Sequence, residues 1–365
     1  MQAGLLDTYH HPVQSRHALA WVLSFLLAAF YVLLYFGPIP RLGIRIDVVE
    51  SAARAAGLDS KWTLYGILYT LAMVGGGVFF LRRHGNSRYE RIRTLSVLFV
   101  QVVFAFALPI VLKVFQRQEY YFSYFWPLKI EYFYPSVILA QPFLIVMWSF
   151  LGSLVAFPLL GYFLGKRFYC SWVCGCGGLA NTFGDPWRHL SDKSANAWRF
   201  EKVSVHTVLG LAVVTTIVVG LNWAIGKNHP QFSAFAFQIQ QWYGFWVGAM
   251  LSGVLGVGLY PLMGSRVWCR FACPMAAILG LIQKFGRFRI TVKKDMCISC
   301  GNCSTYCEMG IDVRAYAMAN QDVKRAACVG CGMCAHVCPR GVLKLENKPT
   351  RWKAGQPIRV YAVDL

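Results

Sequence analysis

Eight of the thirteen cysteines in this 365-residue chain stand in two runs near the C-terminus. Both runs have the spacing C-x2-C-x2-C-x3-C, and they begin at Cys297 and Cys328. In proteins with two [4Fe–4S] clusters, such a run gives three thiolates to one cluster and its fourth to the other. We therefore predict two crossed ligand sets: Cys297, Cys300, Cys303 and Cys338 for one cluster, and Cys328, Cys331, Cys334 and Cys307 for the other.

Two other cysteine chemistries fit this spacing less well. A zinc ribbon holds its metal with two C-x2-C knuckles, whereas each run here adds a third cysteine at the same interval. Closely spaced cysteines separated by small residues also suit a metal site better than a framework of disulfides. The pattern therefore favours iron–sulfur clusters, whose free thiolates require a reducing compartment.

Most of the remaining chain has the composition of a membrane protein. Hydrophobic residues make up 56% of the chain and charged residues only 14%, against roughly 25% charged in soluble proteins. Runs long enough to cross a hydrocarbon core of ~30 Å occur six times, at 18–36, 62–81, 94–115, 136–163, 204–225 and 245–263. We predict six transmembrane helices in contact with membrane lipid, the fourth being tilted or broken near Pro158.

Basic residues between these runs predict the orientation. Links 82–93 and 164–203 carry clusters of Lys and Arg on the side of the N-terminus and of the cysteine runs. Because positively charged loops remain in the cytoplasm, we place both termini and the cysteine-rich domain there, with the helices in a bacterial inner membrane. This distribution also accounts for the net charge of +20, so we expect anionic headgroups and no nucleic acid as its counterpart.

A second cysteine pattern occurs twice, each time after an even-numbered span. Both copies read Gly-x-Arg-x-aromatic-Cys-x3-Cys, with the pairs Cys170 and Cys174, and Cys269 and Cys273. Cysteines at positions i and i+4 share one helix face. Together the two pairs offer four soft ligands to a metal ion or an iron–sulfur cluster. The alternative is that four small buried cysteines only pack helices.

The first copy differs from the second in two ways. Gly175 follows its second cysteine where Pro274 follows in the other copy, and it has an additional thiol, Cys176. We therefore keep Cys176 as a substitute ligand for the candidate site.

The order of these features resembles the NapH/NosR/CcoG group of membrane polyferredoxins, and the resemblance extends from about residue 90. It implies that electrons pass between a quinone pool and a partner protein through [4Fe–4S] clusters. The NapH-like branch, regarded as a quinol dehydrogenase subunit, is nearest, because the chain has no room for the additional periplasmic domains of the other branches. One departure is Glu308, which follows Cys307 where a Pro is usual. We expect little effect from it, because that Pro shapes a turn and binds no iron.

The sequence gives weaker indications for other cofactors. The histidines do not pair within the spans, so we expect no haem, and we expect His336, inside the second run, to be solvated or to tune a cluster. Polar groups at span ends are the candidates for contacts with quinone: His17, Glu201 and His206 on one side, and Glu119, Tyr120, Tyr121, Lys129 and Glu131 on the other. Gln101 and Gln141 lie within spans, as helix-packing or pathway residues.

These observations predict an α-helical membrane protein in three parts: a six-helix domain at 1–285, an α+β ferredoxin-like domain with two [4Fe–4S] clusters at 286–345, and a tail at 346–365. We expect an electron-transfer subunit that links the quinone pool to partner redox subunits of a larger complex. The aromatic links 116–135 and 227–243 would form a docking surface for one of them. The alternatives are a copper reductase or maturation factor of the CcoG type, which receives metal on the C-x3-C thiols, and a structural anchor.

Overall fold

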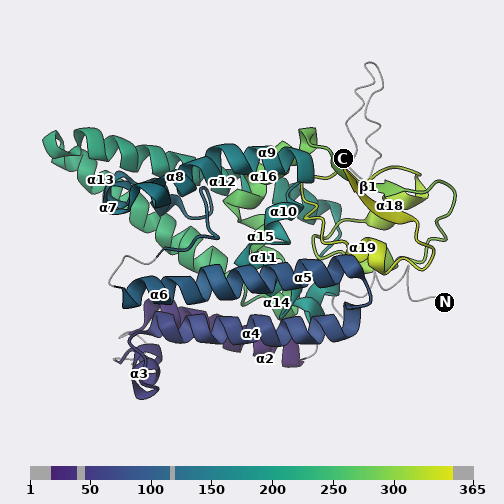
Figure 1. Ribbon diagram of the computed structural model, residues 1–365, viewed down its shortest axis with the longest axis horizontal. Coiled ribbons are helices and arrows are strands. Elements are labelled where there is room, and N and C mark those ends of the chain that lie inside the picture. The colour runs from purple at the N-terminus through teal and green to yellow at the C-terminus, as the bar shows by residue number, and fades with distance from the viewer. Residues whose placement is uncertain (1–17, 39–45, 116–119, 348–365) are drawn as a thin grey trace.

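The computed structural model describes residues 18–38, 46–115 and 120–347. In this part of the chain, five helices are long and apolar enough to cross a membrane: Ala18–Phe36 (α2), Lys61–His84 (α4), Arg88–Val114 (α5 and α6), Phe143–Leu164 (α8 and α9) and Ala195–Asn228 (α12 and a 3-10 turn). They run side by side, with the cysteine-rich domain at one end (Figure 1). The predicted fold class is confirmed: a helical membrane protein with a C-terminal iron–sulfur domain.

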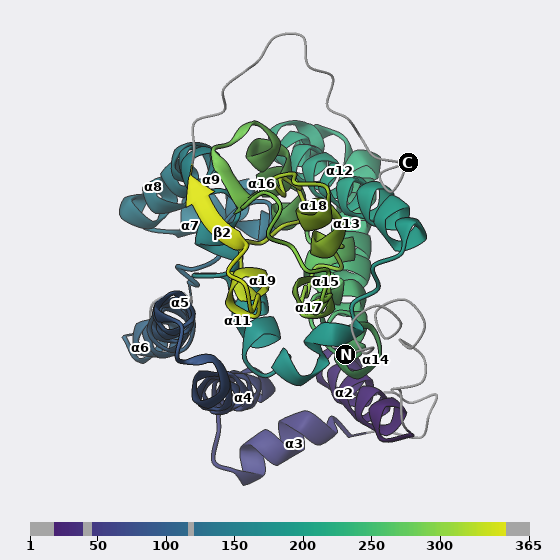
Figure 2. The same ribbon diagram turned by 90° about the vertical axis from the view of Figure 1, so that its right-hand side faces the viewer.

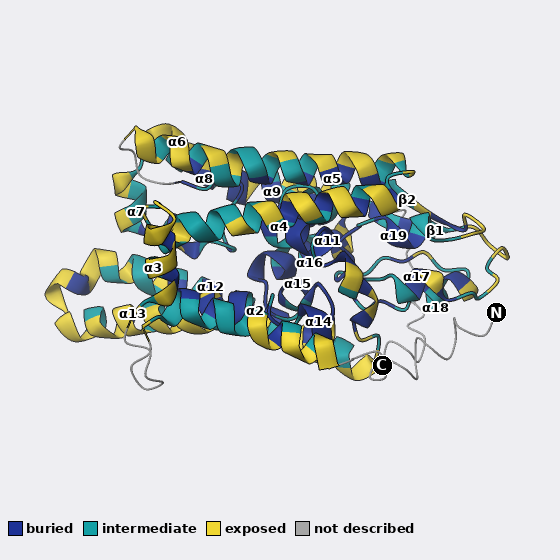
Figure 3. Cartoon of the chain, turned by 90° about the horizontal axis from the view of Figure 1, so that it is seen from below, coloured by how far each residue is buried: buried dark blue, intermediate teal, exposed yellow. Residues whose placement is uncertain are grey.

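Polar residues at the ends of the spans fix where the helices begin. Ser60, Ser87 and Ser194 are the N-caps of α4, α5 and α12, and each side chain accepts a hydrogen bond from a backbone N–H of the first turn. This satisfies donors that the helix itself leaves unpaired. The outer faces of the spans are exposed and apolar, as a lipid contact requires, whereas the buried residues gather inside (Figure 3).

Two of the predicted spans differ from the expectation. The fourth is broken at Pro142 and not near Pro158, because α7 (Pro135–Ala140) ends before Pro142 and α8 (Phe143–Leu151) begins after it. Pro158 instead lies within the continuous helix Phe143–Leu164, directly after the π-helical segment Gly152–Ala156, whose wider turn accommodates a residue without an N–H. Helix α9 spans Phe157–Leu164.

The sixth predicted span, 245–263, is not a single helix. Helix α13 (Pro230–Tyr243) continues into a π-helical segment, Gly244–Leu255, and a turn separates that segment from α14 (Tyr260–Met263). The helix 230–255 packs along α12 and α2. It therefore carries the chain back toward the cysteine-rich domain, although it begins well before the predicted boundary.

Short helices fill the interior between the spans. Helices α10 (Arg167–Cys170) and α11 (Gly175–Asn181) follow α9, and α15 (Val267–Phe271) and α16 (Pro274–Phe285) follow α14. Seen from the cysteine-rich end, α11, α15 and α16 lie within the ring of longer helices (Figure 2). The two C-x3-C motifs are thus held inside the protein. Helix α3 (Val48–Ala55) lies beside α4 and α2 near the opposite end.

The C-terminal domain is tied together by two strands. Strand β1 (Phe288–Val292) pairs antiparallel with β2 (Leu343–Asn347), so that Phe288 faces Asn347 and Val292 faces Leu343. Helices α17 (Asn302–Thr305), α18 (Val313–Met318) and α19 (Met333–His336) lie between them. Because β2 reaches Asn347, it includes two residues that we assigned to the tail. The rest of the tail, 348–365, lies outside the described residues, and the other domain boundaries stay predictions.

Candidate functional site

Two small cavities in the C-terminal domain are each lined by four cysteines. The first is lined by Cys297, Cys300, Cys303 and Cys338. The second is lined by Cys307, Cys328, Cys331 and Cys334. The fold thus brings together the two crossed sets, because the fourth cysteine of each run reaches the other cavity. That these sets ligate iron stays a prediction.

The backbone around the two cavities repeats itself and suits a negatively charged cluster. Gly301 and Gly332 have left-handed φ angles of 83° and 88°, and they precede α17 and α19. Ile311 N–H donates to Cys307 Sγ, and Val342 N–H donates to Cys338 Sγ, both at 3.4 Å. Such donors stabilise thiolate sulfur and raise the potential of a bound cluster. The donor set therefore fits a [4Fe–4S] cluster in each cavity, which would supply one-electron transfer.

The cysteines of the two C-x3-C motifs lie in one buried region of the membrane domain. Cys170, Cys174, Cys269 and Cys273 all belong to the same buried core, with Cys176 packed against it. Burial raises the pKa of Cys273, and the neighbouring Cys269, Cys174 and Cys170 raise it further. The motif is not a single helix, however, so the predicted shared helix face is wrong. Each pair spans the end of one helix and the start of the next, since Cys174 precedes α11 and Cys273 precedes α16.

The local environment of these thiols suits a cationic ligand. Burial raises the pKa of Cys170 to about 12, so a thiolate there needs a metal to balance its charge. The neighbouring thiol of Cys176 holds the pKa of Cys174 below its usual range. Arg266 joins the two pairs, because its Nη1 donates to the backbone oxygen of Cys170 at 3.3 Å and to Cys269 Sγ at 3.7 Å.

Within the described residues, no three His, Cys, Asp or Glu side chains converge closely enough to hold one metal ion. Zinc would need its thiolates ~2.3 Å from one centre, whereas the thiolates of a cubane each bond a different iron and stand farther apart.

A cavity of about 640 Å³ lies between the spans and reaches the first C-x3-C motif. Its wall is largely aromatic: Tyr35, Trp62, Tyr65, Tyr69, Phe106, Tyr121, Tyr124, Tyr243 and Trp268. Cys176 also lines it. The polar residues Ser60, Lys113, Lys129 and Glu131 line the part near the start of α4, the end of the spans away from the cysteine-rich domain. Its size is that of a typical small-molecule site.

Gly175 connects this cavity to the cysteines. A Cβ atom at Gly175 would collide with the Tyr69 hydroxyl and lie 2.6 Å from Gln101 Oε1 and 2.8 Å from the Tyr124 hydroxyl. Gln101 in turn donates from Nε2 to the Val173 carbonyl at 2.6 Å. The departure from Pro at this position is therefore explained, because three polar groups occupy the space that a ring would need.

The structure separates the candidate quinone contacts. Tyr121, Lys129 and Glu131 line the cavity. Tyr120 is buried against Ser149, and Glu201 forms an ion pair with Arg270 at 2.8 Å. His206 is on α12, where its Nδ1 hydrogen-bonds with the Lys202 carbonyl of the same helix, and Gln141 ends α7 outside the cavity. His17 and Glu119 lie outside the described residues.

Sequence reasoning missed the aromatic wall and misjudged Glu308. Tyr65, Tyr69 and Tyr124 look like ordinary membrane aromatics in the sequence, and Gly175 was the only local sign of a crowded polar site. Glu308 is completely buried and forms ion pairs with Arg266 at 2.8 Å and Arg188 at 3.1 Å. Although burial opposes its ionisation, these arginines hold its pKa at about 2. This buried position and its ion pairs were not foreseen from the sequence.

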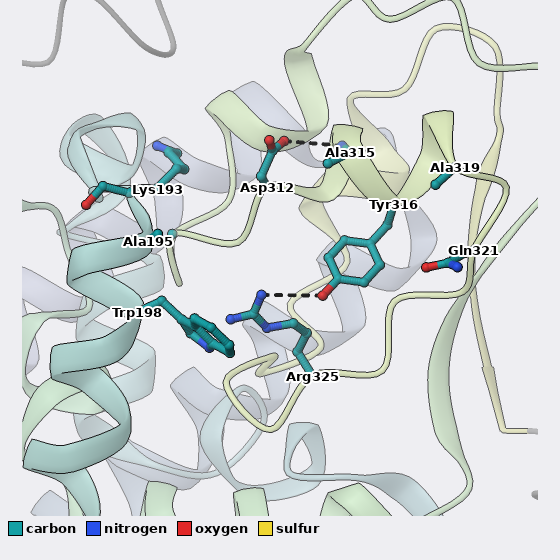
Figure 4. Close-up of a pocket in the computed structure, with 11 residues that line it drawn as sticks. Lys193, Ala195, Trp198, Asp312, Ala315, Tyr316, Ala319, Gln321 and Arg325 are labelled. Atoms are coloured by element: carbon teal, nitrogen blue, oxygen red, sulfur yellow. Dashed lines mark hydrogen bonds between the residues drawn. The ribbon is translucent and has the colours of Figure 1, made fainter. Parts of the chain in front are cut away.

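A further pocket, of about 150 Å³, lies between the start of α12 and α18 (Figure 4). No cysteine lines it. Its cations are already engaged: Arg325 stacks on Trp198 at 4.7 Å and donates to the Tyr316 hydroxyl at 3.4 Å, and Lys193 donates to the His189 carbonyl. We assign no ligand to it.

Comparison with known proteins supports the iron–sulfur assignment. The family described as "4Fe-4S dicluster domain" matches residues 290–345. The family described as "4Fe-4S binding domain" matches 135–193 and 246–293, two segments that contain the C-x3-C motifs. No solved structure matches the chain significantly.

Two curated relatives are similar over part of the chain. YccM of Escherichia coli (strain K12), named as an electron transport protein, is 27% identical over 165 residues, or 44% of this chain and 46% of YccM. MauN of Paracoccus denitrificans, named as a methylamine utilization ferredoxin-type protein, is 29% identical over 180 residues, or 46% of this chain and 61% of MauN. The chain thus spans about half the length of these relatives. The family matches and the apolar helices thus describe a ferredoxin-type, multi-pass membrane protein whose cysteine motifs bind [4Fe–4S] clusters.

Proposed function

We propose that this protein relays electrons between membrane quinone and a partner redox protein, as the NapH-like branch of polyferredoxins is thought to do. In this proposal the cavity between the spans holds the quinone ring, and Cys170, Cys174, Cys269 and Cys273 hold a third [4Fe–4S] cluster. Oxidation of one quinol releases two electrons and two protons, and the clusters accept the electrons one at a time.

The observation that carries the proposal is the position of the cavity beside the buried thiols. Trp268, the residue before Cys269, lines the cavity. Cys176, two residues after Cys174, lines it as well. An apolar slot with a few polar groups at one end is the usual form of a site for a ring-shaped ligand. The match of an iron–sulfur family to both C-x3-C segments supports a cluster at this place.

The residues of the cavity have separate tasks in this scheme. The hydroxyls of Tyr69 and Tyr124, both near Gly175, are placed to hydrogen-bond the ring oxygens of a quinone. The aromatic side chains exclude water from the ring. Lys129 stacks over Tyr121 at 4.7 Å near the polar end of the cavity, where Glu131 can pass protons to water. We place this end outside the cytoplasm, and the cysteine-rich domain and both termini inside it, in a bacterial inner membrane.

The proposal also includes a partner protein, but fewer exposed aromatic residues are available for docking than we predicted. Tyr120 and Phe125 are buried, so the link 116–135 does not present the aromatic patch that we expected. Phe235, Phe237 and Trp242 of α13 are exposed, by 52%, 60% and 58%. Within this proposal they contact lipid or a membrane subunit, while a second partner meets the C-terminal domain.

Anaerobic addition of a short-chain quinol to the purified holoprotein tests the function. We expect the quinol to reduce the clusters, seen as a [4Fe–4S]⁺ EPR signal. The double variant Tyr69→Phe/Tyr124→Phe should slow this reduction at least tenfold, because it loses both hydroxyls, while reduction by dithionite stays complete. Tyr162→Phe, a half-exposed tyrosine on α9 outside the cavity, is the control. Unchanged quinol-driven reduction in the double variant would overturn the assignment of the cavity.

The position of Cys176 favours one second candidate, a copper reductase. A thiol that lines an open cavity could receive a soft metal ion such as Cu(I). Cys176→Ser separates the two functions. A copper reductase would lose copper binding in equilibrium dialysis in this variant, whereas under the quinone proposal neither the wild type nor the variant binds copper.

A further inference from the structure

A buried chain of ion pairs connects the two kinds of cysteine site. Arg266, from the second C-x3-C motif, donates to Cys269 Sγ at 3.7 Å and to Glu308 Oε1 at 2.8 Å. Arg188 contacts Glu308 Oε2 at 3.1 Å and Cys331 Sγ at 3.9 Å. One carboxylate therefore lies between two arginines, and each arginine also contacts a cysteine of a different predicted cluster.

The residues of this chain of ion pairs are buried and held in fixed positions. Arg188, Arg266 and Glu308 are each at most 1% exposed. Arg188 is also held by Asp185 at 3.0 Å and by Asn181 at 2.8 Å, both from the segment after Cys176. Three separate segments thus supply fixed charges with no freedom to turn toward water.

Attachment of the C-terminal domain does not by itself require these charges. Neutral hydrogen bonds already join the domains, including Ser171 to the Val329 carbonyl and Ser191 to the Glu308 carbonyl, both at 2.7 Å. Burying ions is costly and seldom adds stability over apolar packing. In the symmetric half of the domain the equivalent position is Pro339, which is exposed. A carboxylate is therefore not part of the domain fold itself, and its presence needs another reason.

We propose that Glu308 is a positioning residue that sets the reduction potentials of the two facing clusters, by holding Arg266 against Cys269 and Arg188 against Cys331. N–H donors and positive charge beside a ligand sulfur stabilise the reduced cluster, and a nearby carboxylate opposes them. The bridge makes the second-run cluster the one that exchanges electrons with the membrane domain. For the C-x3-C cluster, the inference rests on the proposed function.

Redox titration of the purified holoprotein, followed by EPR, tests the inference with mediators and dithionite and without quinol. Failure of the quinone proposal therefore leaves this test intact. Glu308→Gln keeps the shape and removes the charge. Because the Gln oxygen can still accept from the arginines but no longer opposes their positive charge, we expect the second-run cluster to become easier to reduce. The expected change is about a tenfold higher ratio of reduced to oxidised cluster at fixed potential, or 59 mV for one electron. Glu308→Asp keeps the charge and should shift the ratio less.

The control is Asp295→Asn, which removes an exposed carboxylate two residues before Cys297. Because water screens that charge, we expect less than a twofold change for the first-run cluster. A second-run cluster that titrates as in the wild type, or an equal shift of both clusters in Glu308→Gln, would overturn the inference.

Iron content shows whether the variant still folds and assembles its clusters. If Glu308→Gln assembles poorly, the paired variant Glu308→Gln/Arg266→Gln removes one charge of each sign and restores neutrality. We expect it to retain both C-terminal clusters, with the second-run potential still displaced. Loss of iron from both C-terminal clusters in this neutral variant would assign Glu308 a structural role only and overturn the proposal.

Discussion

The two halves of the C-terminal domain have the same cysteine spacing and nearly the same backbone, yet they face different surroundings. Ser299 and Gly330 occupy equivalent positions, with φ angles of 57° and 60°. Around the first run, Met296 and Ile298 are exposed, by 36% and 55%. Around the second run, Tyr89 donates to the Gly330 carbonyl at 2.8 Å, and Gln283 donates to the Cys328 carbonyl at 2.9 Å. The second half is attached to the membrane domain, whereas the first is open.

The comparison shows that the cysteines determine the two cavities, whereas the residues between them determine which half is attached to the membrane domain. The spacing of the cysteines creates two equivalent cavities, whatever lies between them. The intervening residues decide which cavity adjoins the membrane domain, because Gly330, unlike Ser299 of the first run, leaves room for Arg167 of α10. In the proposed function, a cluster near the membrane domain and another near the surface would form a relay with a defined order.

The largest expected effect comes from removing one cluster at a time. Cys307→Ser should remove the second-run cluster, because ligation crosses over, and quinol should then fail to reduce the first-run cluster. Cys338→Ser should remove the first-run cluster and leave the second-run cluster reducible by quinol. EPR of quinol-treated samples and iron content measure both, each variant losing about four of the irons.

The two variants are each other's control, and dithionite reduction reports whether the remaining cluster is intact. Loss of the second-run cluster in Cys338→Ser would show that ligation is not crossed. Quinol-driven reduction of the first-run cluster in Cys307→Ser would show that the second run is not the entry point.

A smaller effect is expected from the residue that differs most between the halves. Gly330→Ala should destabilise the C-terminal domain by roughly 2 kcal/mol, because a left-handed φ disfavours Cβ and a methyl group there overpacks the contact. That methyl carbon would lie 2.6 Å from Arg167 Cβ and 2.9 Å from Phe288 Cζ. Chemical unfolding, followed by the loss of cluster absorbance, measures the change.

Ser299→Gly is the matched variant in the open half. It relieves the same backbone strain without any new contact, so we expect a gain of about 1 kcal/mol. Equal destabilisation by Ser299→Ala and Gly330→Ala would show that the two halves do not differ in packing, which contradicts the comparison.

Patterns that depend on neighbouring residues were predictable from the sequence. The spacing of eight cysteines predicted two crossed sets, and the fold groups the thiols in that way because the spacing itself forms the loops. The apolar runs predicted five of the spans for the same reason, since hydrophobic length is local. The sixth could not be placed, because the π-helical segment Gly244–Leu255 continues a helix whose first half contains several Gln.

Features that depend on residues far apart in the sequence were not predictable. The Glu308 carboxylate meets Arg266 and Arg188 only after three segments fold together. Likewise, Tyr69 and Tyr124 come from different parts of the membrane domain and converge on Gly175. In both places the sequence carried a sign, a Pro replaced by Glu or Gly, but it did not show which partners fill the space.

The smallest effect is expected where a soluble partner would dock, on the half of the C-terminal domain around the first cysteine run. Lys293, Lys294 and Arg340 are exposed near Met296 and Ile298, and basic groups around an apolar centre attract an acidic carrier. Lys294→Glu should slow electron transfer to an acidic flavodoxin about threefold at low salt, because steering by one rim charge is modest. Lys227→Glu, which makes the same charge change at the far end of α12, should have no effect. Stopped-flow rates of electron transfer to flavodoxin, measured at increasing salt, test this prediction, since the difference between the variants must vanish as the Debye length shrinks.

A slowing that persists at high salt would indicate a lost contact instead of lost steering. Equal slowing in both variants would remove the basis for a partner at the open half.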